Sequence, residues 1–265
     1  MALFTVFLSY LALGALAGTM AGLFGIGGGL VIVPALIFSF EIQGVSPDIS
    51  AHLAVGTSLA TIVFTSISSI RSHHKHRAVR WDIFRSMTVG IVGGAILGAW
   101  TVAFMSGDLL QMIIGVFAIA VGIKMLTAVN PKPGRDVPGP VGLAVAGSGV
   151  GWASAIFGIG GGTLTVPYLS WCNVRMQNTV ATSAACGLPI AMAGALANIW
   201  TGWNNPLLPE YSLGFIYLPA MLGIILTSIF FARIGANLAH RLDSMLLKRI
   251  FAVVLLIVGL RFILS

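Results

Sequence analysis

Apolar residues run along this chain in long stretches that short polar segments separate. A helix that crosses a bilayer needs about 20 predominantly apolar residues, and six stretches have that length and composition. They are residues 51–70, 83–105, 109–128, 179–200, 213–232 and 246–264. The pattern therefore predicts an all-α polytopic membrane protein.

Two further apolar stretches are too long for a single crossing. Residues 3–40 and 138–171 carry no Asp, Glu, Lys or Arg, and a single helix of either length would need an extreme tilt. Glycines interrupt each stretch near its middle. We expect each to form a hairpin of a first helix (3–22 and 139–157), a glycine break and a shorter helix (29–39 and 162–171). Such a hairpin either dips to mid-membrane or crosses twice.

Composition excludes the soluble and disordered alternatives. The 265 residues are 57% hydrophobic and 8% charged, with a mean hydropathy of +1.00, whereas soluble domains carry about 25% charged residues. Disordered chains are poor in apolar residues. The chain is therefore expected to reside in a lipid bilayer.

The positions of the basic residues orient the predicted spans. A net charge of +7 in a soluble protein would indicate a nucleic-acid partner, but here Lys and Arg are absent from residues 1–70 and then cluster in short loops. The positive-inside rule makes four loops cytoplasmic: 71–85, 129–138, 172–178 and 233–245. Loops 40–50, 105–108 and 201–212 carry acids without Lys or Arg and are expected outside. We predict a multi-pass protein of the cytoplasmic (inner) membrane with no nucleic-acid partner.

The glycine breaks contain the same motif. Gly25-Ile26-Gly27-Gly28-Gly29 recurs as Gly158-Ile159-Gly160-Gly161-Gly162, and Pro34 and Pro167 follow. Later segments align in the same order: Thr57-Ser58 with Thr182-Ser183, and Gly122-Ile123-Lys124 with Gly259-Leu260-Arg261. Because the loop charges give the halves opposite orientation, we predict two inverted-topology repeats, 1–130 and 131–265. Each starts with a glycine-broken helical hairpin, and together they supply about eight transmembrane segments in one integral membrane domain.

Paired broken helices in inverted repeats are typical of a substrate site near the membrane midplane. Glycine lets a ligand approach the bare backbone, and helices starting near Gly29 and Gly162 would point N–H groups and positive dipole ends at an anion. The competing interpretation is close helix packing, for which small residues are common in membranes. The doubled motif inside overlong spans favours the substrate site.

Hydroxyl and amide groups inside the spans would add hydrogen-bond donors for an anion, although Ser and Thr also bond the backbone of membrane helices. The predicted substrate-binding set is Gly25, Gly27, Gly28, Gly29, Thr57, Ser58, Gly158, Gly160, Gly161, Gly162, Thr163, Thr182, Ser183 and Asn198. No carboxylate lies mid-span, so export driven by the membrane potential is favoured over a proton relay. Lys124 and Arg261 are either snorkelling anchors or charges that guide anions to the two membrane sides.

The histidine-rich run, the two cysteines and the search for catalytic motifs do not point to enzymatic or metal chemistry. The run His73-His74-Lys75-His76-Arg77 could hold a metal or lipid headgroups, but a solvated topology determinant is favoured. Cys172 and Cys186 are expected to pack as small hydrophobes. The sequence has no HExxH or GxSxG motif and no paired intramembrane acids, so we expect neither an enzyme nor a bound metal or cofactor.

The two Gly-Ile-Gly-Gly-Gly motifs with their following Thr-Ser pairs resemble the sulfite exporter TauE/SafE family of membrane proteins. The resemblance extends over essentially the whole chain. It implies a carrier of about eight helices in the cytoplasmic membrane that exports sulfite, sulfoacetate or a related organosulfur anion. It leaves the particular anion and the oligomeric state open. An anion channel, an intramembrane enzyme and a structural scaffold are the alternatives.

Overall fold

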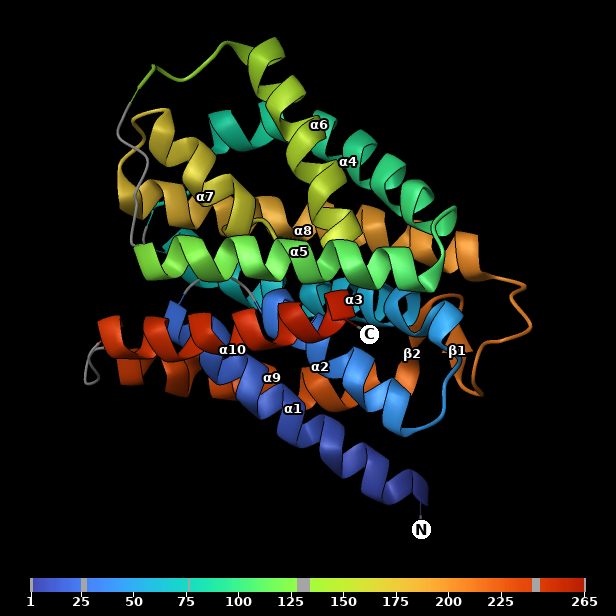
Figure 1. Cartoon of the computed structure of the whole chain (residues 1–265). Coiled ribbons are helices and arrows are strands. Elements are labelled where there is room, and N and C mark those ends of the chain that lie inside the picture. Colours follow the sequence, from blue (N-terminus) through green and yellow to red (C-terminus); the bar gives the residue numbers. More distant parts are fainter. Residues whose placement is uncertain (1, 25–27, 76, 128–133, 240–243, 265) are drawn as a thin grey trace.

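The computed structural model describes residues 2–24, 28–75, 77–127, 134–239 and 244–264. Within them the chain forms ten α-helices and one two-stranded hairpin (Figure 1). The helices are α1 (Ala2–Phe24), α2 (Gly29–Ile42), α3 (Pro47–Lys75), α4 (Trp81–Ala103), α5 (Gly107–Thr127), α6 (Pro140–Phe157), α7 (Gly162–Trp171), α8 (Met176–Gly202), α9 (Leu218–Ala239) and α10 (Ser244–Leu264). Five of them, α3, α4, α5, α6 and α8, are long and apolar enough to cross a membrane. The predicted all-α polytopic fold is confirmed.

Both predicted glycine breaks separate a long helix from a short one. α6 ends at Phe157, and the next residue, Gly158, has a φ of 61°, in the left-handed region that favours glycine. α7 begins after Gly161 and has 10 residues, which rise about 15 Å, half the apolar thickness of a bilayer. α2 begins after Gly28 and has 14 residues, which rise about 21 Å. The short helices are therefore too short for a full perpendicular crossing.

One predicted boundary is wrong. The apolar stretch 213–232 was expected to be helical throughout, but α9 starts at Leu218. The residues before it form a hairpin of β1 (Ser212–Leu213) and β2 (Ile216–Tyr217). Gly214 turns the chain there with a φ of 54°. The strand residues are as apolar as the helix that follows, so hydropathy alone hides the turn.

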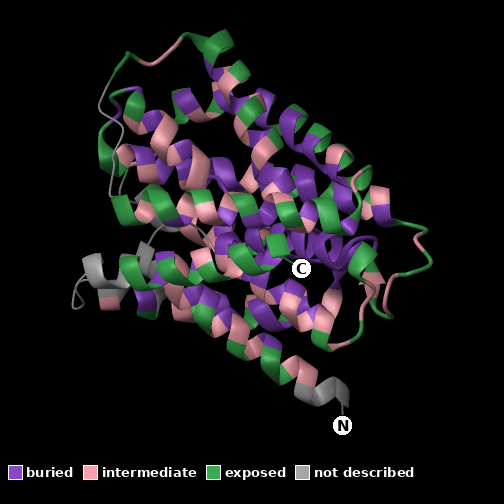
Figure 2. Ribbon diagram, in the orientation of Figure 1, coloured by how far each residue is buried: buried purple, intermediate pink, exposed green. Residues whose placement is uncertain are grey.

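Helices α3 and α8 form the centre of the molecule. The apolar windows of α3 and α8 are 61% and 67% buried, compared with 33% for α5 and for α6. Buried colour accordingly gathers at the centre of Figure 2, while the outer helices show a mixture of buried, intermediate and exposed residues. Most buried polar side chains also lie on α3 and α8. Polar groups in the membrane are therefore enclosed by protein, as the cost of exposing them to lipid requires.

The first helix of each half packs against the fourth helix of the other. α4 lies along α6, and α1 lies along α9. Glycines allow this close approach: Gly94 of α4 meets the backbone of Ser148 in α6, and Gly18 of α1 meets the backbone of Ser228 in α9. Close helix packing therefore accounts for these glycines at the α4–α6 and α1–α9 contacts. The fifth helices, α5 and α10, pack on each other.

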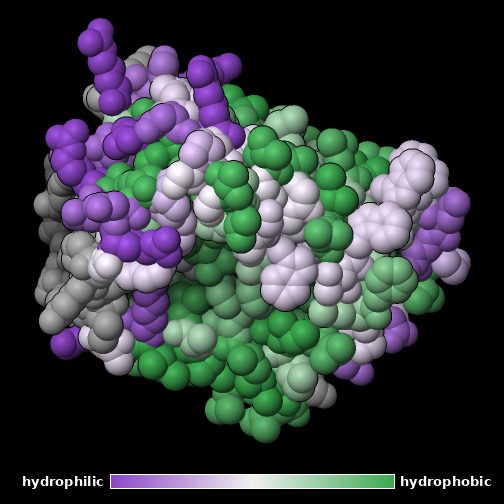
Figure 3. All heavy atoms as spheres, turned by 90° about the horizontal axis from the view of Figure 1, so that it is seen from above, coloured by the Kyte–Doolittle hydropathy of each residue, from purple (hydrophilic) through white to green (hydrophobic). Residues whose placement is uncertain are grey.

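The surface has an apolar band between two polar ends. Figure 3 shows hydrophilic residues at the left and right edges and hydrophobic ones between them. The α2–α3 turn, the α4–α5 turn and the β1–β2 hairpin share the right-hand end of Figure 1. The two turns lie in loops that the charges place outside, and the hairpin follows the third such loop, 201–212. That side assignment stays a prediction, as do the two inverted repeats.

Candidate functional site

The start of α2 lies directly against the break between α6 and α7. A Cβ atom added to Gly29 would lie 2.5 Å from the Gly158 carbonyl oxygen and 2.9 Å from the Cα atom of Ile159. The Cδ1 atom of Ile62, on α3, would be 3.1 Å from the same Cβ. Ile62 also approaches Gly160, where Cγ2 would lie 3.4 Å from an added Cβ. Gly29 of the first motif is thus brought together with Gly158 and Gly160 of the second.

A hydroxyl of the first half binds the broken backbone of the second. Ser58 Oγ, on α3, donates a hydrogen bond of 2.7 Å to the Gly158 carbonyl oxygen, and both residues are buried. Lipid offers no donor for a carbonyl freed at a helix end. Beside the break, Phe157 stacks on Phe117 of α5, with ring centres 3.8 Å apart. α3 and α5 therefore support the break of the second motif.

The start of α7 is enclosed by α8. Gly161, the residue before α7, lies against the Ser183 carbonyl oxygen, and an added Cβ would be 2.9 Å from the Gly187 nitrogen. Among the described residues no side chain caps this helix end. The hydroxyls of Ser183 and Thr165 are fully buried and have no hydrogen-bond partner in the described part of the chain. The start of α7 thus packs against the α8 backbone, and each of these two helices carries a buried hydroxyl without a hydrogen-bond partner in the described residues.

Thr165 was missing from the predicted set. It lies in the first turn of α7, where its backbone nitrogen donates to the Gly161 carbonyl oxygen at 2.9 Å. The signal was present in the sequence, because Thr163 and Thr165 both follow the second motif where the first has Leu30 and Ile32. Gly162 and Thr163 are half-buried in the same turn. Gly25 and Gly27, also predicted, lie outside the described residues.

Thr57 and Thr182 perform matching structural tasks in this structure. Thr57 Oγ1 accepts a hydrogen bond of 2.9 Å from the backbone N–H of Tyr217, directly before α9. Thr182 Oγ1 accepts one of 3.0 Å from the backbone N–H of Arg80, directly before α4. Each threonine thus ties its half to the fourth helix of the other half. Contact of either hydroxyl with substrate stays a prediction.

Asn198 lies far from the start of α7, and Gly28 is less tightly packed than Gly29. Asn198 Nδ2 donates to the Gly194 carbonyl oxygen at 2.8 Å, and the Asn198 backbone oxygen accepts from Phe215 at 3.1 Å, beside the hairpin. Asn198 and Ser183 are separated by about 22 Å along α8. Gly28 is half-buried, and an added Cβ would meet the flexible Ile32 side chain at 3.1 Å. The structure therefore divides the predicted set instead of gathering it in one place.

Metal and thiol chemistry find little support in the described residues. Within them, no group of three or more His, Cys, Asp or Glu side chains is placed to hold a metal ion. The ring of His74 packs edge-on against Trp81, 5.6 Å between ring centres, and His76 lies outside the described residues. Cys172 and Cys186 are buried and free of disulfides. Burial raises the pKa of the Cys172 thiol, which keeps it protonated and unreactive.

Comparison with known proteins gives a consistent picture. A family model described as "Sulfite exporter TauE/SafE" matches residues 10–262. A probable membrane transporter protein of Haemophilus influenzae is 37% identical over 264 residues, which cover 99% of this chain and 100% of that protein. Similar proteins of the same description occur in Methanocaldococcus jannaschii, 28% identical over 93% of this chain and 91% of the relative, and in Bacillus subtilis, where YunE is 27% identical over 97% of each. No solved structure matches the chain significantly.

Proposed function

The chain belongs to the sulfite exporter TauE/SafE family, and from that premise we propose that it is a secondary carrier that exports a small anion across the cytoplasmic membrane. Membrane transport of a small molecule follows from the family. Sulfite or an organosulfonate such as sulfoacetate is the proposed substrate. Both carry several acceptor oxygens and negative charge, so both need a pocket of donors that is shielded from lipid.

The observation that carries the proposal is the start of α7, which packs against α8. Backbone N–H groups and the helix dipole favour an anion there, and the hydroxyls of Ser183 and Thr165 are buried without a partner in the described residues. A buried hydroxyl that makes no hydrogen bond costs about 1–3 kcal/mol. A bound oxyanion would accept from both hydroxyls and remove that cost.

The close packing at the centre favours a carrier over an anion channel. Gly29 and Gly158 are in backbone contact, and the Ile62 side chain lies beside them. In a carrier built from two repeats, relative movement of helix bundles exposes a central site to each side of the membrane in turn. A membrane potential of 100 mV, negative inside, favours the exit of one negative charge by about 2.3 kcal/mol. The membrane potential is therefore the proposed energy source for efflux.

Proteoliposomes test this proposal directly. Purified protein is reconstituted, loaded with radiolabelled sulfite or sulfoacetate, and efflux is followed with the potential and the pH gradient collapsed separately. We expect efflux to fall when the potential is removed. Efflux that ignores the potential but needs the pH gradient would refute the mechanism, absence of flux for both anions would refute the substrate class, and single-channel currents would establish the channel alternative.

Reporter fusions test the proposed sidedness. A periplasm-specific reporter is joined at Trp203, which follows α8, or at Lys75, the last residue of α3. We expect periplasmic activity only at Trp203. Activity at Lys75 would reverse the orientation deduced from the loop charges.

A further inference from the structure

A second polar constellation lies at the end of α10. One guanidinium nitrogen of Arg261, Nη2, lies 3.3 Å from Oε2 of Glu41 at the end of α2. The guanidinium carbon also lies 4.3 Å from the centre of the Phe38 ring. The ion pair and the cation–π contact together hold the Arg261 side chain between the two halves.

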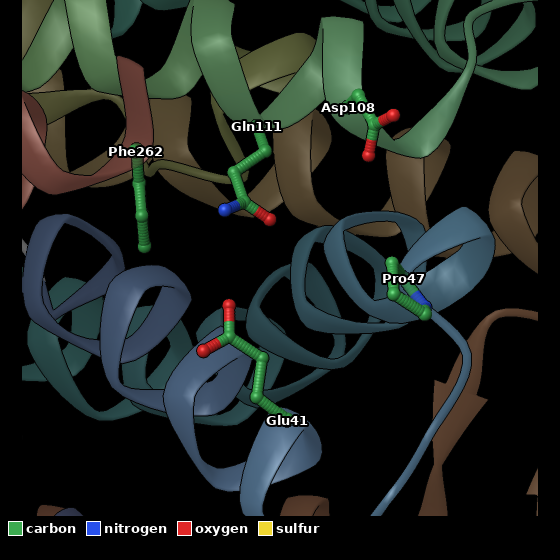
Figure 4. Close-up of a pocket in the computed structure, with 5 residues that line it drawn as sticks. All are labelled: Glu41, Pro47, Asp108, Gln111 and Phe262. Atoms are coloured by element: carbon green, nitrogen blue, oxygen red, sulfur yellow. The ribbon is translucent and has the colours of Figure 1, made fainter. Parts of the chain in front are cut away.

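This constellation stands beside a cavity of about 370 Å³ that opens at the predicted outer end. Figure 4 shows its lining residues, which come from α2, α3, α5 and α10: Glu41, Pro47, Asp108, Gln111 and Phe262. The carboxylate of Glu41 points towards the amide of Gln111 across the cavity (Figure 4). Arg261 adjoins the cavity, because its ion-pair partner Glu41 and its chain neighbour Phe262 both line it.

The bond between Arg261 and Glu41 is weak enough to exchange. It is a single contact of 3.3 Å, and the side chains of Arg261 and Glu41 are 62% and 30% exposed. Exposed ion pairs of this kind contribute little to stability. A guanidinium carries five N–H donors arranged to bind two oxygens of one oxyanion at once, so one contact with Glu41 leaves most of them available. The Phe38 face meanwhile holds the planar group in place.

The position of Arg261 is also exceptional in the sequence. Every other Lys and Arg falls on the predicted cytoplasmic side, and Lys124, its counterpart in the first half, is at the opposite end of the α5–α10 pair. A lone cation on the outer side runs against the positive-inside rule. A role in export accounts for its presence there.

We propose that Arg261 is an external binding point for the exported oxyanion, which displaces Glu41 from the guanidinium on its way out. The carboxylates of Glu41 and Asp108 then face an anion that carries the same sign of charge, and they favour its release over its return. The inference rests on the proposed function and adds the outer end of the anion path to it.

Sided membrane vesicles test the inference. Exchange of radiolabelled sulfite and sulfoacetate is measured in right-side-out vesicles, where the outer face meets the label, and in inside-out vesicles, where the cytoplasmic face does. We expect Arg261→Gln to raise the half-saturation concentration about fivefold in right-side-out vesicles only, the scale of one exposed charge pair. Arg249→Gln is the matched control, because Arg249 is exposed on the same helix near its other end, and it should leave both values unchanged.

A second variant separates binding from misfolding. Glu41→Gln removes the competitor for Arg261 and should lower the external half-saturation concentration about twofold, an effect that a folding defect cannot produce. Arg261→Lys should recover only part of the affinity, since an ammonium lacks the two-pronged geometry. An external value for Arg261→Gln within twofold of wild type, or equal changes on both faces, overturns the inference while wild-type transport upholds the proposed function. No wild-type exchange of either anion overturns both.

Discussion

The two glycine motifs are identical in sequence, yet the helices that follow them differ in polarity and packing. α2 begins Gly29-Leu30-Val31-Ile32, whereas α7 begins Gly162-Thr163-Leu164-Thr165. The glycine before α7 is pressed against the α8 backbone, while the glycine before α2 faces a flexible isoleucine side chain. The two glycine breaks therefore differ in their surroundings, and we expect them to contribute unequally to anion binding. Hydroxyl donors are concentrated at the start of α7.

The largest difference in effect is expected when a methyl group is added to the glycine before each short helix. Gly161→Ala would drive a Cβ into the backbone of Ser183 and Gly187, and overpacking of this kind costs about 1–3 kcal/mol. We expect a lower apparent Tm in detergent and loss of most anion flux. Gly28→Ala should stay close to wild type, because only the end of the Ile32 side chain must move.

Gly93→Ala is the control for this pair, since Gly93 is exposed on α4 and an added Cβ would meet nothing within 4 Å. Equal losses for the variants at positions 28 and 161 would contradict the proposed asymmetry of the two breaks.

An intermediate effect tests what the halves have in common. Thr57→Val and Thr182→Val each remove the acceptor of a backbone N–H, and a buried donor without a partner costs about 1–3 kcal/mol. Both variants should lower the apparent Tm, Thr57→Val more, because its bond to Tyr217 is fully buried and the bond from Arg80 to Thr182 is only partly buried.

Thr88→Val provides the comparison for the two threonines. Thr88 Oγ1 only donates to the Phe84 carbonyl oxygen of its own helix, at 2.7 Å, so its loss should change the apparent Tm little. A Tm for Thr57→Val that matches the control would show that the hydroxyl does not brace α9.

The smallest effect separates support from binding. Ser58→Ala removes the donor to the Gly158 carbonyl oxygen and should cost about 1 kcal/mol of stability. Ser183→Ala removes no hydrogen bond within the described residues, so its Tm should stay at the wild-type value while the half-saturation concentration for anion efflux rises. The reverse pattern, with stability lost at Ser183 and affinity lost at Ser58, would exchange the two roles.

Most of the fold could be predicted because it depends on two strong signals. Apolar length gave the helices, and glycine within an overlong stretch located both breaks. The error at residues 213–217 arose where apolar strand residues precede an apolar helix. The hairpin turns at Gly214, whose φ is positive. The hydropathy pattern cannot reveal such a turn, because the residues on both sides of it are apolar.

The site was less predictable, because neighbouring positions on a helix point in different directions. Thr57 and Ser58 were predicted as one pair, yet Thr57 meets Tyr217 and Ser58 meets Gly158. Each residue advances about 100° around the helix, so a pair in sequence faces two neighbours in space. The identity of these neighbours depends on how helices of one half pack against helices of the other. A local sequence pattern does not contain that information.

The packing of α1 on α9 and of α4 on α6 has a consequence for how the protein is synthesised and assembled. Helices leave the ribosome in order, and α1 and α4 enter the membrane before their partners α9 and α6 have been synthesised. The glycine-containing faces of α1 and α4 are therefore expected to contact lipid, or an insertion factor, until the second half has been synthesised. A first half alone therefore lacks the packing partners of α1 and α4, and truncated chains are expected to be targets of membrane proteolysis. We expect assembly to be completed late in translation, because α9, which packs on α1, is the ninth of the ten described helices.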